Sequence, residues 1–333
     1  MCRVSVVIPV YNSERFLNET LDSLLNQTMP DWDCILVNDC STDCSQNIID
    51  EYVARDNRFL SFVLPENSGC ADVPLGYGME QATSPFCCLM GHDDVLEPIY
   101  FEKLLAKQAE TNADIVTATM IYCAKELEGE IYRLPESSFD MSQVLTGREA
   151  FAKTIGGWQL PLNGMLYRKE LNEGVTRGKH MNSDEFSSRQ ILFKASRVAF
   201  SDARYIYRQF QESISRKAAP RLWQRAFVDL QVVDFVKQHY QYDESIQKSA
   251  ITSQFFNLVH LTAGARIEKL ECKDRKLVVA EMRNAYEQTD KSLVQKFLPK
   301  HHTVFVKGCS WFELISTFYV IFHKMCGKKY EYK

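Results

Sequence analysis

Three pairs of acidic residues stand at positions where carboxylates can do chemistry. Two pairs directly follow short apolar segments, and the third follows a polar, glycine-containing stretch. Adjacent carboxylates are costly without a positive partner, and a divalent cation bridging phosphate oxygens is such a partner, because Mg²⁺ and Mn²⁺ prefer oxygen ligands. A single carboxylate near a hydroxyl can instead act as a general base. The pairs are Asp39 with Asp43, Asp93 with Asp94, and Asp184 with Glu185.

Most of these acids also have a purely structural interpretation. Asp43 and the pair at 184–185 stand where helices are expected to begin, and acidic side chains favour the positive end of a helix dipole. Asp94 is placed to cap the next helix, which would leave Asp93 in a solvated turn. Asp39 is harder to explain in this way, because it directly follows an apolar strand. Both interpretations stay open for the other acids.

The elements that must position these carboxylates alternate between strand and helix. The segments Val4–Val10 and Cys34–Val37 are short apolar runs rich in β-branched residues, and the leucines between them share one helical face. This alternation with short connections predicts an α/β fold, with a Rossmann-like, mostly parallel central sheet flanked by helices. Further strands are expected at 59–64, 85–90 and 114–122, with helices over 71–81 and from 98 onward.

Polar residues follow the first two predicted strands. Tyr11 and Asn12 end the first strand, and Asn38 and Asp39 end the second. In an open parallel sheet, ligands bind beyond the carboxyl ends of the strands. A carboxylate at that edge suits the ribose or the base of a nucleotide, so the opening of the chain predicts half of a nucleotide site.

The pattern changes twice further along the chain. Between about 125 and 215 it loosens, with strands expected at 165–167 and 197–209 and a helix at 184–195. After Pro220 the apolar spacing is almost entirely helical. We therefore predict a nucleotide-binding domain over residues 1–215 and a helical region over residues 216–333.

Charge is unevenly divided between these two parts. Residues 1–215 carry 19 Lys and Arg against 31 Asp and Glu, whereas residues 216–333 carry 20 against 12. The acidic first part argues against nucleic acid as a partner. The basic second part indicates either an anionic surface, such as a membrane, or a solvated basic face. The 11 cysteines include no C-x-x-C pair and no secretory signal is recognised, which predicts reduced core thiols in a cytoplasmic protein.

The last apolar segment, residues 311–322, is rich in aromatic side chains and flanked by lysines. A membrane-spanning helix needs about 20 apolar residues, and this segment is shorter and contains Glu313. Two interpretations stay open. Residues 305–333 either form a peripheral anchor that lies in the membrane interface or contain a helix docked on the preceding ones.

Several motifs stand out in combination: Val4–Asn12, Asn38–Asp43, Asn67-Ser68-Gly69, Asp93-Asp94-Val95-Leu96, Ser183-Asp184-Glu185-Phe186, and Tyr207-Arg208 followed by Ser213. Together they resemble family 2 glycosyltransferases over about residues 3–215. The resemblance implies a GT-A fold and an inverting transfer of a sugar from a nucleotide diphosphate sugar, most often UDP-linked, to a hydroxyl of a glycan or lipid-linked acceptor. Such enzymes often build cell-surface polysaccharide.

The resemblance also implies roles for single residues. Asp184 matches the catalytic base of the family, and Asp93 matches the last acid of its DxD motif, which binds a divalent metal, Mn²⁺ or Mg²⁺, on the diphosphate. Trp158 and Asp94 fall in the part expected to meet the acceptor. The nucleotide sugar would be framed by Pro9, Tyr11, Asn12, Asp39, Gly69, His92 and Asp93.

Three departures from the family pattern stand out. Gly91 replaces the first acid of the DxD motif, so metal binding rests on Asp93 with His92 beside it. The segment Val73-Pro74-Leu75 stands where many relatives carry Ala-Arg-Asn, and Ser183 replaces the acid before the base. The altered DxD motif and the missing arginine leave a non-catalytic nucleotide-sugar-binding or scaffolding protein as an alternative.

A nucleotidyltransferase is a further alternative, because such enzymes can share a similar sheet. It would need a glycine-rich, basic loop after the first strand to hold a triphosphate. The segment Tyr11-Asn12-Ser13-Glu14 offers neither glycine nor lysine. The motifs therefore favour a metal-assisted glycosyltransferase.

Overall fold

Two compact units make up the chain in the computed structural model. Unit 1 comprises residues 1–154 and 158–210, and unit 2 comprises residues 155–157 and 211–333. The boundary predicted at 215/216 lies outside the described residues. The structure describes residues 3–123, 127, 129–157, 159–209, 220–267, 270–300 and 305–325.

The first half of the sheet in unit 1 is parallel. Strand β1 (Val4–Val10) pairs in parallel with β2 (Trp32–Asn38) and with β4 (Phe86–Leu89), and β2 pairs in parallel with β3 (Phe59–Val63). Six of the seven residues of β1 are buried, which explains why its sequence is a continuous apolar run rather than an alternating one.

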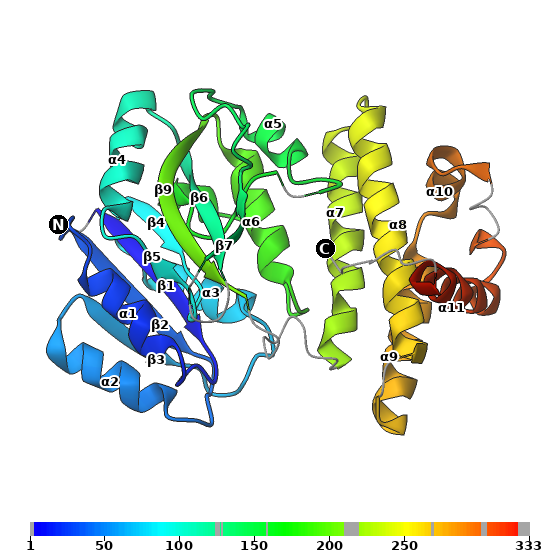
Figure 1. Cartoon of the computed structure of the whole chain (residues 1–333), viewed down its shortest axis with the longest axis horizontal. Helices are drawn as coiled ribbons and strands as arrows, with labels where there is room; N and C mark the ends of the chain where they lie inside the picture. The colour runs from blue at the N-terminus through cyan, green and yellow to red at the C-terminus, as the bar shows by residue number, and fades with distance from the viewer. Residues whose placement is uncertain are drawn as a thin grey trace. The chain divides into compact units, whose positions relative to one another are not determined.

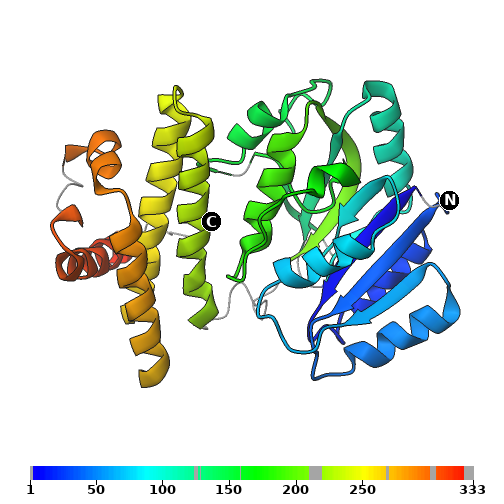
Figure 2. The same ribbon diagram turned by 180° about the vertical axis from the view of Figure 1, so that it is seen from behind.

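Helices cover both faces of this sheet, as Figures 1 and 2 show from opposite sides. One face packs its even-numbered β1 side chains against α1, α2 and α4, and the other face packs Val7 against α3, α5 and α6. The predicted α/β fold, with a central sheet flanked by helices, is confirmed. The helices are α1 (Leu17–Leu25), α2 (Ser45–Arg55), α3 (Asp72–Gln81), α4 (Tyr100–Thr111), α5 (Gly147–Ala152) and α6 (Ser183–Lys194).

The second half of the sheet is mixed rather than uniformly parallel. Strand β8 (Leu166–Arg168) enters antiparallel between β4 and β6 (Ile115–Cys123), and β9 (Val198–Arg208) runs parallel to β6. Two further strands were not expected from the sequence, because one has only two residues and the other is exposed along most of its length. These are β5 (Val95–Leu96), antiparallel to β9, and β7 (Glu130–Leu134), antiparallel to β6.

Unit 2 is helical in its described residues, as the sequence predicts. Its core gathers aromatic side chains, with Phe255 and Phe312 fully buried. No described helix is both long and apolar enough to cross a membrane. The helices are η2 (Pro220–Gln224), α7 (Arg225–His239), α8 (Glu244–Ile267), α9 (Cys272–Gln288), α10 (Lys291–Phe297) and α11 (Cys309–Met325).

Helix α11 has one buried and one exposed apolar face. Phe312 and Val320 are buried, and the carboxylate of Glu313 is buried against the guanidinium groups of Arg266 and Arg283. This pairing explains how an acidic residue is tolerated in an apolar helix. The exposed side chains are those of Trp311, Leu314, Phe318, Ile321 and Phe322.

Candidate active site

The carboxyl end of β2 holds a buried carboxylate. The side chain of Asp39, only 4% exposed, accepts hydrogen bonds from the Ser68 amide (2.8 Å), the Ser68 hydroxyl (2.9 Å) and the Asn67 side-chain amide (3.1 Å). The residue that follows this loop segment, Gly69, has φ of +83°, a conformation that favours glycine. Asp39 therefore fixes the loop after β3 at the edge where parallel strands present their ligands.

The loops after β1 and β2 are joined to each other through Asn12. Its side-chain oxygen accepts a hydrogen bond from the Thr42 backbone amide at 2.8 Å, and its own backbone amide donates to the Ser41 hydroxyl at 3.0 Å. Pro9 lies in β1 opposite Val37, and Tyr11 is partly exposed just beyond the strand. The structure thus brings Pro9, Tyr11, Asn12, Asp39 and Gly69 to one edge of the sheet.

Asp94 is turned into the protein rather than toward an acceptor. It is 1% exposed and accepts from the Tyr205 hydroxyl at 2.5 Å and from the Arg208 amide at 3.1 Å. Burial, followed by the nearby charge of Asp93, raises the pKa of Asp94 well above its usual range. This placement gives Asp94 a structural role and leaves almost none of its surface for an acceptor.

The backbone around Asp93 is held from two sides. The Arg208 guanidinium donates to the Asp93 carbonyl at 3.0 Å, and the Thr20 hydroxyl donates to the His92 carbonyl at 3.0 Å. Asp93 itself keeps part of its surface exposed. Within the described part of the chain, the His92 Nδ1 atom is buried without a hydrogen-bond partner.

A divalent metal fits this turn only if substrate phosphates and water bind it together with Asp93. The described residues contain no group of three or more His, Cys, Asp or Glu side chains that would hold a metal on their own. Mg²⁺ and similar ions are commonly bound through one or two carboxylates together with substrate phosphates and water. The accessible carboxylate of Asp93 suits that kind of site.

The first turn of α6 carries a carboxylate with a strongly shifted pKa. Burial, and then the negative charges of Glu185 and Asp72, raise the pKa of Asp184 to about 7, against the opposing influence of Arg177. Glu185 is engaged elsewhere, because it pairs with Arg189 (3.4 Å) and accepts from the Asn182 side chain (2.7 Å). A carboxylate that titrates near neutral pH has the properties of a general base.

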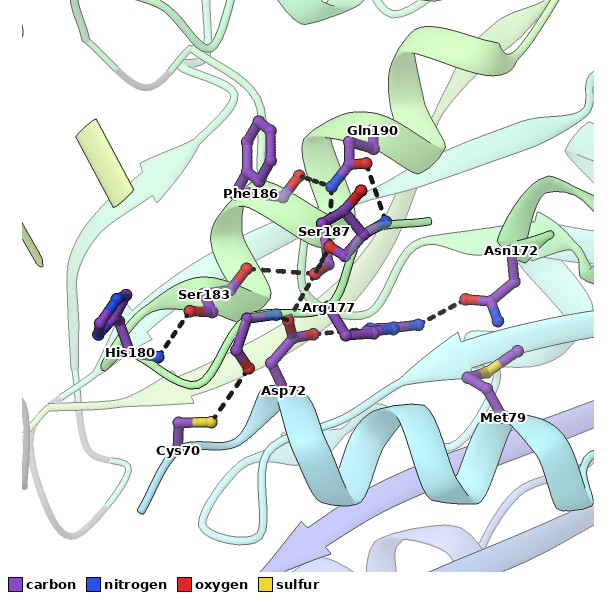
Figure 3. A network of polar contacts seen from close by, with 12 residues as sticks. Cys70, Asp72, Met79, Asn172, Arg177, His180, Ser183, Phe186, Ser187 and Gln190 are labelled. Atoms are coloured by element: carbon purple, nitrogen blue, oxygen red, sulfur yellow. Dashed lines mark hydrogen bonds and ion pairs between the residues drawn. The ribbon is translucent and has the colours of Figure 1, made fainter. Parts of the chain in front are cut away.

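Two charged residues near Asp184 were missed in the sequence. Asp72 and Arg177 form an ion pair at 2.8 Å beside the first turn of α6, as the close view in Figure 3 shows. Asp72 lies within a correctly predicted helix, and Arg177 lies in a polar loop that carries no periodic pattern. No local signal reveals the pair, because its partners are 105 residues apart.

Trp158, which the sequence predicts as an acceptor contact, lies outside the described residues.

Comparison with known proteins matches unit 1 to a family. A model of the family "Glycosyl transferase family 2" matches residues 5–175. Glycosyltransferase GlyG of Streptococcus pneumoniae is 28% identical over 235 residues, which cover 68% of this chain and 77% of GlyG. A poly(ribitol-phosphate) beta-glucosyltransferase of Bacillus spizizenii is 38% identical over 96 residues, which cover 28% of this chain and 15% of that protein.

The fold is also that of a solved structure. TarS 1–349 from S. aureus, in complex with UDP-GlcNAc, superposes with a TM-score of 0.70 over 99% of this chain and 94% of that chain. The sequence identity is 16%, so this likeness establishes the fold alone. Because the family model spans more than half of the residues, the chain belongs to glycosyl transferase family 2, and it is a glycosyltransferase with the GT-A fold.

Proposed function

We propose that this enzyme transfers a sugar from a UDP-sugar to a hydroxyl of a cell-surface glycan or its lipid-linked precursor, with inversion at the anomeric carbon. The observation that carries the proposal is Asp184, a carboxylate with a pKa of about 7 in the same unit as the nucleotide edge. In the reaction, the acceptor oxygen bonds to the anomeric carbon, its proton passes to Asp184, and the bond to the diphosphate breaks. A single displacement of this kind inverts the stereochemistry at that carbon.

The donor assignment draws on both the site and the comparisons. TarS is described in complex with UDP-GlcNAc and with UDP. In our proposal the nucleoside lies beside Asp39 and Gly69, within reach of Pro9, Tyr11, Asn12 and His92. Asp93 would hold a divalent metal together with the diphosphate, and a bound metal would stabilise the negative charge of the leaving group.

The acceptor assignment rests on a relative and on charge. The Bacillus spizizenii relative is named for a poly(ribitol-phosphate) substrate, an anionic polymer rich in hydroxyls. Residues 216–333 of this chain carry 20 Lys and Arg against 12 Asp and Glu, which favours an anionic partner. We therefore propose a hexosyl or N-acetylhexosaminyl transfer in surface polysaccharide synthesis, at the inner face of the membrane, with residues 305–333 as the peripheral contact.

The test is a measurement of UDP release from UDP-sugars, beginning with UDP-GlcNAc and UDP-glucose, with poly(ribitol phosphate) as acceptor and with or without Mn²⁺. We expect one donor to raise the melting temperature of the protein and to release UDP. Replacing Asp184 by Asn should lower the rate by about 10²–10⁴-fold, the usual contribution of a general base, while leaving the thermal response to the donor intact. A donor that binds without any UDP release would favour the non-catalytic alternative, and an Asp184→Asn enzyme as fast as its parent would overturn the base assignment.

A further inference from the structure

A polar network ties the start of α3 to the start of α6 (Figure 3). Its centre is Asp72, in the first turn of α3, whose side chain is fully buried. The carboxylate accepts hydrogen bonds from the Arg177 guanidinium at 2.8 Å, from the Gly178 amide at 2.7 Å and from the Ser187 hydroxyl at 2.7 Å. Three donors therefore compensate one buried charge, and all three lie more than 100 residues further along the chain.

The segment that supplies two of these donors is fixed by α6 as well. The side-chain amide of Gln190 accepts from the Thr176 amide at 3.0 Å and donates to the Thr176 carbonyl at 3.0 Å. Arg177 also donates to the side-chain oxygen of Asn172. Residues 172–178 are thus held between α3 and α6.

The network reaches the first turn of α6 by two routes. Ser187 stands one helical turn after Asp184, so the two side chains lie on the same face of α6. Gly178 lies so close to Ser183, the residue before Asp184, that an added Cβ would come within 2.2 Å of the Ser183 hydroxyl. Asp72 therefore holds α6 at positions on both sides of Asp184.

The Asp72 carboxylate also follows closely, along the chain, the loop at the nucleotide edge, which is the edge of the sheet that carries Asp39 and Gly69. Asp72 is three residues beyond Gly69, in the stretch whose start is fixed by Asp39 through Asn67 and Ser68. The thiol of Cys70 also contacts the Gly178 carbonyl at 3.5 Å. One buried group thus connects the loop at the nucleotide edge to the helix that carries Asp184.

We propose that Asp72 is a positioning residue of the transfer reaction, which holds the Asp184 carboxylate in register with the loop 67–70 at the nucleotide edge. This inference rests on the proposed role of Asp184 as the base. Burying a charge is costly unless it is paired and hydrogen-bonded, and a link that only holds two segments together needs no charge. The charges of the Asp72–Arg177 pair are therefore explained if they act on the Asp184 carboxylate.

The groups that face Asp184 support this electrostatic role. Asp72 and Glu185 raise its pKa and Arg177 lowers it. Tyr207 of β9 and Cys70 also interact with the Asp184 charge. Since Asp72 and Arg177 act in opposite directions, removing their charges one at a time should shift the titration of Asp184 in opposite directions.

The first experiment compares two serine-to-alanine variants of α6. Ser187 bonds to Asp72, whereas the adjacent Ser188 is similarly buried but does not belong to the network. We expect Ser187→Ala to lower kcat for UDP release from UDP-GlcNAc by about tenfold or more, since small misplacements of a reacting group cost up to about 100-fold. Its amides over 178–184 should also exchange faster. Ser188→Ala should stay within about twofold of the parent, and equal effects of the two substitutions would overturn the proposal.

The second experiment needs no donor and so separates this inference from the proposed function. The carboxyl carbon of Asp184 is followed by ¹³C NMR across pH, with Asp184→Asn to assign its signal. Asp72→Asn should move the titration to lower pH, and Arg177→Gln should move it to higher pH. Should Asp72→Asn fail to fold, Arg177→Gln and Ser187→Ala still decide the matter. Titration that neither charge change moves would overturn the electrostatic part of the proposal, whereas a parent enzyme that releases no UDP would count against the proposed function alone.

Discussion

The carboxylate of Asp94 occupies the space that a side chain at position 91 would need. A Cβ added to Gly91 would lie 2.5 Å from the Asp94 Oδ2 atom, which is held there by the Tyr205 hydroxyl. The same hydroxyl accepts a hydrogen bond from the Gly91 amide at 3.0 Å. An acidic side chain at position 91 would therefore collide with Asp94 in this chain, so the glycine there is weak support for a non-catalytic protein.

We predict that Gly91→Ala lowers the free energy of unfolding by about 1–3 kcal/mol, as overpacking of a tight site usually does. Gly91→Asp should behave worse and should not improve Mn²⁺-dependent UDP release. The matched control is Gly76→Ala in α3, where an added Cβ meets only ordinary contacts at 3.5 Å or more and alanine favours the helix. Thermal and urea unfolding measure both variants, and a Gly91→Ala protein as stable as the control would contradict the steric explanation.

The raised pKa of Asp184 predicts opposite effects on activity and on stability. The rate should fall as the pH drops below about 7, because the protonated carboxyl cannot accept the acceptor proton. For folding, a raised pKa in the folded state means that ionised Asp184 destabilises the protein, increasingly between pH 4 and 7 and fully above pH 7. Asp184→Asn should therefore raise the melting temperature at pH 8 and lose this advantage toward pH 4. A melting temperature unchanged at pH 8 would show that the carboxylate is better solvated than its surroundings indicate.

Strand ends and helix starts are the positions where a sequence reveals site residues. Asp39 is predicted as a site residue because it directly follows an apolar strand, and Asp184 because it stands at an expected helix start inside a motif that resembles the family. Asp72 was not identified, since only its distant partners distinguish it from any acid in a first helical turn. The inward direction of Asp94 was equally hidden, because its partners Tyr205 and Arg208 are more than 100 residues away.

At the scale of whole elements, burial decides what was predictable. The strands β1 to β4 are apolar along most of their length and were placed within a few residues. Strand β7 is almost entirely exposed and gave no signal, and β8 looked like an isolated strand with no indication of its antiparallel direction. Helix α2 begins at Ser45, two residues after the expected start at Asp43, because the Asp43 carboxylate accepts a hydrogen bond from the Ser45 amide.

The loop after β3 gives a prediction about the donor. Asp39 holds this loop through Ser68, so Asp39→Asn should weaken UDP binding by about 10–100-fold, which corresponds to the roughly 1.5–3 kcal/mol of a hydrogen bond to a charged group. Isothermal titration with UDP measures the affinity. Asp50→Asn, on the exposed face of α2, is the control and should bind UDP as the parent does. Equal affinity in both variants would place the nucleoside away from Asp39.

Across the whole molecule, the described cysteines are all free, but three of them, Cys40, Cys44 and Cys272, are exposed rather than in the core.

The second part of the chain combines a basic net charge with an exposed apolar helix face. Helix α11 presents an aromatic face in which Phe318 and Phe322 are each 64% exposed. Exposed aromatic side chains in a segment that lysines flank in the sequence suit the interface of an anionic membrane.

We predict that the full chain sediments with vesicles that contain phosphatidylglycerol, more weakly at high salt and hardly at all with neutral vesicles. Replacing Trp311, Phe318 and Phe322 together by Ser should lower this binding by about tenfold or more, because each aromatic side chain contributes buried apolar area. Tyr242→Ser is the matched control, since that ring is 98% exposed and lies outside α11. Binding that survives the triple substitution would exclude α11 as the membrane contact. If the intact chain does not bind anionic vesicles, the exposed apolar face of α11 would instead favour a protein partner.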